Sequence, residues 1–384
     1  MQIIPIASGK GGVGKSLLSA NLAIALAQGG KRVVLADLDL GGSNLHLILG
    51  IRNVSHGIGA FLTESKLNFD NIILETEYQG LRFIPGDAEI PGIANLNASQ
   101  KRMLIRRLSA VDADYLLLDL GAGTSFNTVD FFLMSGQGII LTTPTPTALV
   151  NAYLFVKNSV FRIIHNSFKK KSKAAAYLEN ARKDASSMQR IYIPRLLDAI
   201  KDIDPESYEA ARDAVVRFRP RLIMNMLEDP KDADKANRLR RSCQQYLDLD
   251  MEHLGIMYRD DLQDVALSSR MPIIVYKPAS VLAQAIYRVA DKVVQLGDAE
   301  DEPFGFEEDE ELLDESYEEA GIQAEADFET KMDYVEDLLN TGALTTGDLI
   351  ETIKSQRLEI TQLKRHSALL SSRLQKAIEL GFEP

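Results

Sequence analysis

Short runs of hydrophobic residues alternate along most of the chain with segments of helical periodicity. We expect eight strands, at IIPIAS, KRVVLADLD, LRFIPG, DYLLLDLG, GIILTTP, RLIMNM, HLGIMY and PIIVYKP. Several of these runs are almost continuously hydrophobic, which is typical of strands covered on both faces in a parallel sheet. The pattern therefore predicts an α/β fold of three layers around a doubly wound, mostly parallel sheet.

The segment between the first two strands has the pattern of a helix. In KSLLSANLAIALAQGG the hydrophobic residues recur at helical spacing. Gly29 and Gly30 follow them, and glycine is typical of the end of a helix. Strand, loop, helix and strand thus follow one another at the N-terminus, which is the context of a phosphate-binding loop.

Residues 162–219 are the first of three segments that depart from a compact α/β domain. They separate a predicted helix from the strand RLIMNM and are far longer than one crossover requires. Because they include FKKKSKAAAYLENARK, we expect a helical insertion. The cluster KKKSK could contact DNA or an anionic lipid, and a solvated helix face explains it equally well.

The net charge of −12 is concentrated in residues 298–337. This segment holds 19 of the 55 acidic side chains and one basic side chain, Lys331. The rest of the chain carries 36 acidic and 42 basic side chains, so it is mildly basic. Because the segment contains few hydrophobic residues, we expect an acidic, disordered linker.

A heptad pattern marks the C-terminal segment, residues 338–384. Between Leu349 and Ala377, seven of nine seam positions are hydrophobic. This predicts a helix of about 43 Å that forms a coiled coil and offers a site for a protein partner. The alternative is an amphipathic helix that folds back onto the body of the protein. The main domain then comprises residues 1–297.

The candidate chemistry begins with SGKGGVGKS, residues 8–16. Gly9 and the triplet Gly14, Lys15, Ser16 have the spacing of a phosphate loop. Backbone N–H groups of such a loop surround a β-phosphate at the positive end of the following helix. Lys15 would then bridge the β- and γ-phosphates, and the Ser16 hydroxyl would ligate Mg²⁺. The loop also contains a second lysine, Lys10.

Two carboxylate motifs end other predicted strands. ADLDLGG places Asp37 and Asp39 at the carboxyl end of the second strand, and LLLDLGAG places Asp119 at the end of another. Ligands of doubly wound sheets bind at these strand ends, so we expect Asp119 to hold the Mg²⁺ shell through water. Gly121 and Gly123 leave room for a loop that senses the γ-phosphate.

The motifs KGGVGKS, DLDLGGSN, DLGAG and TTPTPTALVNAY together resemble the deviant Walker A ATPases of the MinD/ParA family. The chain is most similar to the FlhG-type and MinD-like members, over roughly residues 1–160 and 218–296. The resemblance implies a P-loop NTPase fold, with ATP and Mg²⁺ as cofactors. It also implies that two ATP-bound subunits pack face to face, so that Lys10 of one subunit reaches the phosphates of the other.

The resemblance further implies the role of each site residue. It implies catalysis by Lys10, Lys15, Asp39 and Asp37, in which Asp39 positions the attacking water. The metal would be held by Ser16, Asp39 and Asp119. Adenine would be read by Asn225, and the nucleotide would be bound by Gly9, Lys10, Gly11, Gly12, Val13, Gly14, Lys15, Ser16 and Leu17. Tyr258 stands where many members have proline, which departs from the base-enclosing loop of the family.

These features predict an ATP-hydrolysing dimerisation switch that positions a flagellar, polar or division machine. Two alternatives stay open: a ParA-like ATPase that moves DNA, and a nucleotide-bound scaffold without enzymatic activity. The single cysteine, Cys243, excludes a disulfide framework within one chain and suits a reducing cytosol. We therefore expect a cytoplasmic protein, with peripheral association with the inner membrane, the cell pole or nonspecific DNA left open.

Overall fold

A computed structural model describes residues 1–64, 66–86, 96–183, 192–298 and 308–342, together with residues 345, 347, 350, 353, 354 and 357. The chain divides into two compact units, Met1–Asp327 and Phe328–Pro384. The first unit contains the β-sheet and every residue that the sequence assigns to the site.

The first unit is built on an eight-stranded sheet with the strand order β3-β4-β2-β5-β1-β6-β7-β8. All neighbouring strands are parallel except β3 and β4, which are antiparallel. The strands are β1 (Gln2–Ala7), β2 (Val33–Leu38), β3 (Leu74–Glu75), β4 (Leu81–Ile84), β5 (Tyr115–Leu120), β6 (Ile139–Thr142), β7 (Arg221–Leu227) and β8 (Glu252–Tyr258). The predicted doubly wound α/β fold is confirmed.

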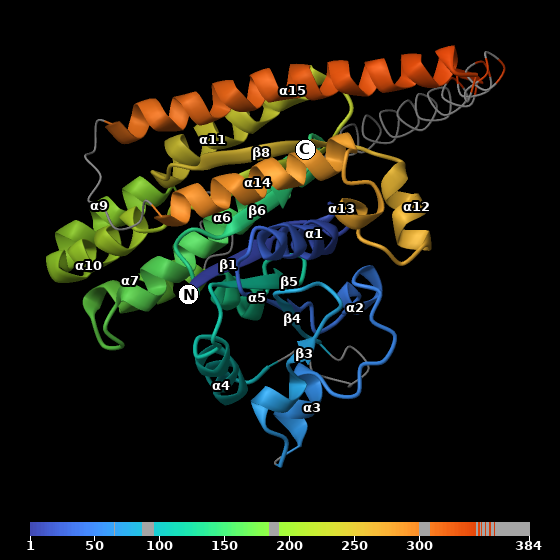
Figure 1. Ribbon diagram of the computed structural model, residues 1–384. Coiled ribbons are helices and arrows are strands. Elements are labelled where there is room, and N and C mark those ends of the chain that lie inside the picture. The colour runs from blue at the N-terminus through green and yellow to red at the C-terminus, as the bar shows by residue number, and fades with distance from the viewer. Residues whose placement is uncertain are drawn as a thin grey trace, which may run out of the picture. The chain divides into compact units, whose positions relative to one another are not determined.

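Helices cover both faces of the sheet (Figure 1). One face carries α1 (Lys15–Gln28), α13 (Ile273–Tyr276) and α14 (Val281–Asp298), and the other carries α5 (Phe126–Phe132) and α6 (Pro146–Ser167). The remaining elements of the α/β body are α2 (Leu45–Ile48), α3 (Ile58–Thr63), α4 (Ala98–Leu108), α11 (Asp234–Leu247), α12 (Leu262–Ser268) and the 3-10 turns η1 (Phe69–Ile72) and η2 (Pro230–Ala233).

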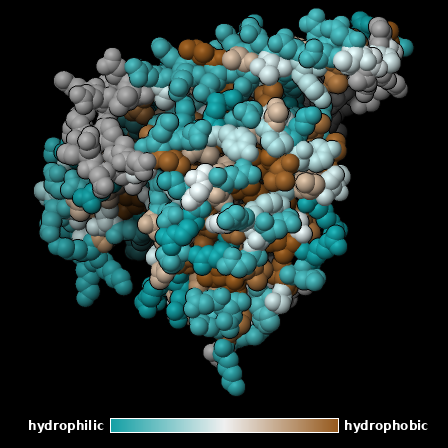
Figure 2. All heavy atoms as spheres, in the orientation of Figure 1, coloured by the Kyte–Doolittle hydropathy of each residue, from teal (hydrophilic) through white to brown (hydrophobic). Residues whose placement is uncertain are grey.

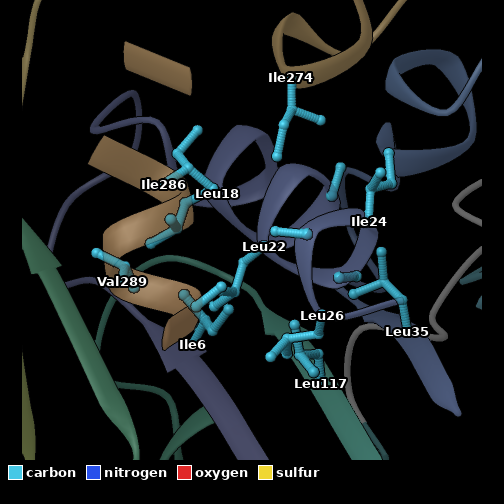
Figure 3. Packing of buried hydrophobic residues seen from close by; sticks show 14 of the residues in the cluster. Ile6, Leu18, Leu22, Ile24, Leu26, Leu35, Leu117, Ile274, Ile286 and Val289 are labelled. Carbon is cyan, nitrogen blue, oxygen red and sulfur yellow. The ribbon is translucent and has the colours of Figure 1, made fainter. Parts of the chain in front are cut away.

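Helix α1 lies at the centre of the main hydrophobic core. It is buried on nearly every side because it is enclosed between the sheet and α14, which explains why its hydrophobic residues form no single stripe. In Figure 3, Leu18 lies near Ile286 of α14, while Leu22 and Leu26 point toward the strands. Each such side chain contributes ~1.5–3 kcal/mol by leaving water. The packing fixes the position of the loop that precedes α1.

The described parts of the long stretch between α6 and β7 are mostly helical, as the sequence predicts. Helix α6 runs to Ser167, and α7 (Lys173–Lys183), α9 (Ile193–Ile203) and α10 (Pro205–Val216) follow it. The lysines of KKKSK are exposed, three in the connection between α6 and α7 and Lys173 at the start of α7, and Lys169 forms an ion pair with Glu206.

The run PIIVYKP was predicted to be a strand, and this prediction is wrong. Residues Ile273–Tyr276 form the one-turn helix α13. Pro272 precedes the turn, and the N–H of Ile274 donates a hydrogen bond to the side chain of Asn21 in α1 instead of to a neighbouring strand. Ile273 and Ile274 are both fully buried, so a short apolar run was mistaken for a buried strand.

The acidic segment 298–337 was predicted to be a disordered linker. Residues 299–307 lie outside the described part of the chain, but Glu308–Asn340 form the long helix α15. Its first part buries a seam of residues, Tyr317, Ala320 and Ala324, whose spacing is helical. The prediction is therefore wrong for α15, because a few well-spaced small and aromatic residues outweigh the acidic composition.

Ion pairs and hydrogen bonds hold the first part of α15 on the body. Three of its carboxylates pair with three basic side chains of the first unit: Asp314 with Arg240, Glu319 with Lys292, and Asp327 with Arg288. The Tyr317 hydroxyl donates to the carbonyl of Met251, and the Tyr258 hydroxyl donates to that of Ala324. The acidity of this segment thus matches the basic surplus of the body.

The predicted coiled coil between Leu349 and Ala377 lies almost wholly outside the described residues. It stays a prediction. In the part of the chain that the structure describes, no helix is long and hydrophobic enough to cross a bilayer.

The face of the molecule drawn in Figure 2 is mostly hydrophilic. Hydrophobic residues are visible on it in several places, around α13 among them, and Leu47 of α2 is exposed. Scattered exposed hydrophobic residues of this kind are normal for a folded domain.

Truncation of Tyr317 tests whether α15 is part of the folded unit. We expect Tyr317→Ala to lower the free energy of unfolding by ~3 kcal/mol or more, because it removes a buried ring and a hydrogen bond. Tyr334→Ala is the matched control on the same helix, since Tyr334 is 44% exposed. Urea unfolding of the full chain measures both. Equal, small effects would contradict the packing of α15.

Candidate nucleotide-binding site

The loop between β1 and α1 has the backbone conformation of a phosphate-binding loop. Gly12 and Gly14 have φ values of +78° and +89°, in the left-handed region that favours glycine. Gly14 is the N-cap of α1, and no side chain caps this helix end. The first N–H groups of α1 are therefore available to an anion, which the helix end also attracts electrostatically.

Lys15 is buried at the start of α1 and faces the end of β5. Its Nζ lies 3.3 Å from Oδ1 of Asp119, and the two side chains are 7% and 1% exposed. Oδ1 of Asp119 also accepts a hydrogen bond of 2.9 Å from the hydroxyl of Ser19, one turn further along α1. Burial raises the pKa of Asp119, and interactions with Lys15, Ser16 and Ser19 oppose this increase.

Asp37 lies directly beside Asp119, because these two residues are paired in the register of β2 and β5. Burial, followed by repulsion from Asp119, raises the pKa of Asp37 to about 7. Hydrogen bonds from the Ser43 hydroxyl at 2.6 Å and the N–H of Asp39 at 3.1 Å oppose this increase. Two buried carboxylates thus stand side by side at the carboxyl edge of the sheet.

Asp39 is half-buried in the loop that follows β2. Its Oδ1 would lie 3.2 Å from a Cβ atom built on Gly121, in the loop that follows β5. Gly42 also lies against this carboxylate. The predicted water-positioning residue is therefore at the edge of the site, next to the loop that was predicted to sense the γ-phosphate.

The donor set at this edge fits Mg²⁺. Mg²⁺ prefers oxygen ligands and is usually bound through one or two carboxylates, water and the phosphates of a nucleotide. The Ser16 hydroxyl and the Asp119 carboxylate meet this requirement, because Ser16 interacts with Asp119. Among the described residues, no group of three or more His, Cys, Asp or Glu side chains forms a metal cage. A site of this kind would take its other ligands from nucleotide and water.

Lys10 lies apart from Lys15 and Asp119. It is exposed, and its Nζ donates a hydrogen bond of 3.2 Å to the hydroxyl of Thr147 in the first turn of α6. Next to it, a Cβ atom on Gly9 would come within 2.1 Å of the carbonyl oxygen of Asn151 in the same helix. The two lysines of the loop therefore face different surroundings, one the buried carboxylates and the other solvent and α6.

Asn225, at the end of β7, contacts the loop itself. Its Nδ2 donates a hydrogen bond of 2.8 Å to the carbonyl of Val13, and its Oδ1 accepts one from the N–H of Met226. A side chain at Gly14 would collide with Nδ2 at 2.4 Å. The amide of Asn225 therefore supports the loop, and its predicted contact with adenine stays a prediction.

The remaining predicted residues of the loop differ in their exposure. Gly11 and Gly12 are exposed, Val13 is buried in the core, and Leu17 packs against the core from the first turn of α1. Tyr258, by contrast, is 1% exposed, and its hydroxyl is directed at α15. It acts as an anchor for α15.

A model of the CobQ/CobB/MinD/ParA nucleotide-binding domain matches residues 4–356, which is most of the chain. The chain belongs to this family. The expected resemblance to MinD/ParA proteins is thereby confirmed.

Curated relatives within this family include three bacterial proteins. The flagellum site-determining protein YlxH of Helicobacter pylori is 37% identical over 158 residues, which cover 41% of this chain and 53% of that protein. The antiactivator FleN of Pseudomonas aeruginosa is 31% identical over 159 residues, or 41% of this chain and 56% of FleN. The septum site-determining protein MinD of Helicobacter pylori is 34% identical over 148 residues, or 38% and 54%. The chain spans about half the length of the curated relatives it matches.

Solved MinD structures have the same fold. MinD of Pyrococcus horikoshii, solved with Mg-ADP, is 21% identical and has a TM-score of 0.52, covering 78% of this chain and 98% of that one. MinD of Pyrococcus furiosus is 19% identical and has a TM-score of 0.53, covering 77% and 99%. At these identities the likeness concerns the fold alone, and it supports the predicted P-loop fold.

Sequence reasoning missed the residues that hold the predicted ones in place. Ser19, Ser43 and Thr147 bind the side chains of Asp119, Asp37 and Lys10, respectively. Ser19 could have been found, because it follows Lys15 by one helical turn and so lies on the same face of α1. Thr147 gives no such signal, since it is distant from Lys10 in the sequence.

Alanine substitution of two neighbouring glycines tests the contact between the loop and α6. Gly9→Ala forces a collision with the backbone of α6, so we expect it to destabilise the protein by ~3 kcal/mol or more. Gly11→Ala is the control, because its Cβ would have its nearest neighbour at 4.0 Å. Chemical unfolding without nucleotide measures both variants. Equal tolerance of the two substitutions would show that Gly9 does not press on α6.

The raised pKa of Asp37 predicts a pH-dependent stability. A carboxyl that titrates near 3.8 in the unfolded chain and about 7 in the folded protein binds its proton more tightly when folded. Its contribution to stability therefore falls as pH rises from about 4 to 7, by on the order of 1.4 kcal/mol per pH unit. Asp37→Asn should remove this loss.

Unfolding of the native chain and of Asp37→Asn at pH 5, 6, 7 and 8, without Mg²⁺, measures the effect. The stability of the variant relative to the native protein should rise up to about pH 7 and then level off. Asp70→Asn, on η1, is the control for the loss of one carboxylate, because Asp70 is exposed. A stability difference between Asp37→Asn and the native protein that does not change with pH contradicts the buried, protonated state of Asp37.

Proposed function

We propose that the protein is an ATP-hydrolysing switch that dimerises when it binds ATP and Mg²⁺. The observation that carries this proposal is the different placement of the two loop lysines. Lys15 is buried against Asp119, whereas Lys10 is exposed on the outer side of the same loop. Lys15 serves the nucleotide of its own chain, and Lys10 is left for the nucleotide of a second subunit.

The surroundings of each carboxylate support the proposed catalytic roles. Asp39 is half-buried and adjoins the loop around Gly121, so it is accessible to a water molecule that attacks the γ-phosphate. Asp37 and Asp119 are buried beside each other, and a bound cation would relieve their mutual repulsion. Mg²⁺, when bound, would supply charge neutralisation at the phosphates, and Ser16 and Asp119 would hold it.

A lysine supplied by the partner subunit would make hydrolysis conditional on dimerisation. A cation brought in trans contributes about 10³–10⁵ in rate to related phosphoryl transfers. A monomer would therefore bind ATP but hydrolyse it very slowly. This property converts the nucleotide state into an assembly state, which is what a switch requires.

We infer further that the switch serves the placement of a cellular machine. The relatives that support this are named flagellum site-determining and septum site-determining proteins. The ATP-bound dimer would dock on such a machine at a pole or a division site, and hydrolysis would release it. The predicted C-terminal helix would be a further docking site for a protein partner under this proposal.

A mixing experiment with two inactive variants tests the trans role of Lys10. Lys10→Ala keeps Asp39 but supplies no lysine, and Asp39→Ala supplies the lysine but cannot position water. In a mixed dimer, the subunit with Lys10→Ala receives Lys10 from its partner and regains one functional site. An equal mixture should then recover about a quarter of the native ATPase rate, because half of the dimers are mixed and each has one functional site. If Lys10 acts within its own chain, the mixture stays inactive.

Mass measurements complete the test of the switch. Light scattering after gel filtration should show a larger mass for Asp39→Ala with ATP than with ADP, since hydrolysis no longer releases the dimer. Because both nucleotides are compared on the same chain, any association through the predicted C-terminal helix that does not depend on nucleotide adds equally to both masses. Lys15→Ala, which should lose nucleotide binding, is the negative control. Equal masses of Asp39→Ala with ATP and ADP would refute the proposed switch.

A further inference from the structure

An open groove of about 790 Å³ lies between α6, α9 and α11, apart from the phosphate loop. Two of its walls belong to the part of the chain that resembles MinD/ParA proteins. The third wall, α9, comes from the helical insertion and contacts α11. The insertion therefore turns the exposed sides of α6 and α11 into a concave surface.

The floor of the groove exposes hydrophobic side chains. Val150 and Leu154 of α6 are 58% and 40% exposed, and Tyr246 of α11 is 45% exposed. Their neighbours on α6, such as Phe155 and Val156, are fully buried. Exposed large hydrophobic residues gathered in a concave surface are typical of a binding site.

The rim of the groove is basic. Arg195, Lys235 and Arg238 line it together with the buried Lys157, and none of the described residues that line it is acidic. Lys235 already forms an ion pair with Asp232. Within the described residues, no carboxylate is paired with Arg195 or Arg238, which are both exposed. This arrangement is complementary to a ligand that is hydrophobic on one side and acidic at its flanks.

The tyrosines show which kind of ligand fits. Tyr246 meets Tyr153 and Tyr192 edge to face, with ring centroids 6.5 and 6.2 Å apart. The guanidinium of Arg195 covers a face of Tyr192 at 5.9 Å. These contacts take up much of the ring surface on which bases of a single-stranded nucleic acid would stack. A flat lipid surface does not follow a groove between helices, whereas a helix of ~10 Å diameter does.

From this geometry we propose that the groove binds an acidic amphipathic helix of a partner protein. Hydrophobic side chains of the partner, spaced by three and four residues, lie on Val150, Leu154 and Tyr246. Its glutamate or aspartate side chains pair with Arg195 and Arg238. The proposal is independent of nucleotide, because none of these residues belongs to the nucleotide-binding site.

Stapled helical peptides of about four turns test this proposal, because shorter unconstrained helices are marginal in water. The panel carries Leu, Phe, Tyr or Met at the anchor positions and Glu at the flanks. A second panel has the same anchors with Lys at the flanks. Fluorescence anisotropy with the full chain, without nucleotide, should show saturable binding of at least one Glu peptide, weakened by salt, and no binding of its Lys counterpart.

Variants of the groove identify the binding surface. Leu154→Asp and the double variant Arg195→Glu/Arg238→Glu should each weaken binding about ten-fold or more. The controls are Val216→Asp and Arg212→Glu on α10, which change exposed residues of the same types outside the groove. Thermal unfolding of each variant verifies that it is folded.

Several results would overturn the proposal. These are no binding by any Glu peptide, equal binding of the Glu and Lys panels, or equal losses in the groove and control variants. Binding of a DNA oligonucleotide or of phosphatidylglycerol vesicles through Arg195 and Arg238, with no peptide binding, would do so too. A decrease in the mass of the native assembly on Leu154→Asp would assign the groove to a second copy of the chain instead.

Discussion

The candidate site depends on one arrangement of buried charge, in which Lys15 and the two carboxylates of Asp37 and Asp119 meet at the carboxyl edge of the sheet. The parallel register of β2 and β5 forces the carboxylates together, and the packing of α1 against the core fixes the lysine. Burial raises the pKa of both carboxyl groups, and the ammonium of Lys15 opposes this increase at Asp119 without offsetting it. A bound cation would relieve this unfavourable burial of two neighbouring carboxyl groups, so under the proposed function the cost in stability and an affinity for Mg²⁺ would have the same origin.

Helix α6 is the second element on which the site depends. Its first turn provides Thr147 to Lys10, and its backbone at Asn151 leaves room only for glycine at position 9. The same helix carries Val150 and Leu154 into the groove beside α9 and α11. Only a few residues therefore separate the surface proposed for a partner from the lysine proposed to act in trans. A rigid helix shared by two sites is a simple physical route by which one could influence the other.

The sequence predicts those parts of the fold and site that depend on local pattern. Continuous apolar runs identify the seven longest strands. The glycines and Lys15 identify the loop, because positive φ angles and the close approach of other backbone atoms restrict several loop positions to glycine. The antiparallel strand β3 is too short to produce a pattern. The strand prediction for Ile273–Tyr276 is wrong for a different reason. This run has a clear hydrophobic pattern, but a buried helical turn and a buried strand are both hydrophobic throughout, so the pattern does not distinguish them. What the sequence does not contain is the pairing of distant residues, such as Asn225 with Val13 or Thr147 with Lys10, which only the tertiary fold creates.

The prediction that was based most on composition, a disordered acidic linker, is wrong at α15 because it ignores where the charges of the body lie. A net charge of −12 suggests a uniformly acidic protein, but the excess of acidic over basic side chains lies in one segment and the body is mildly basic. The body uses its basic side chains in two different ways. Arg240, Arg288 and Lys292 pair with carboxylates of α15, so that an acidic helix is held on a complementary surface. Arg195 and Arg238, at the rim of the groove, form a second basic surface that is complementary to acidic side chains. That an acidic helix already packs on one basic surface of this protein is the strongest physical precedent for a second acidic helix on the other.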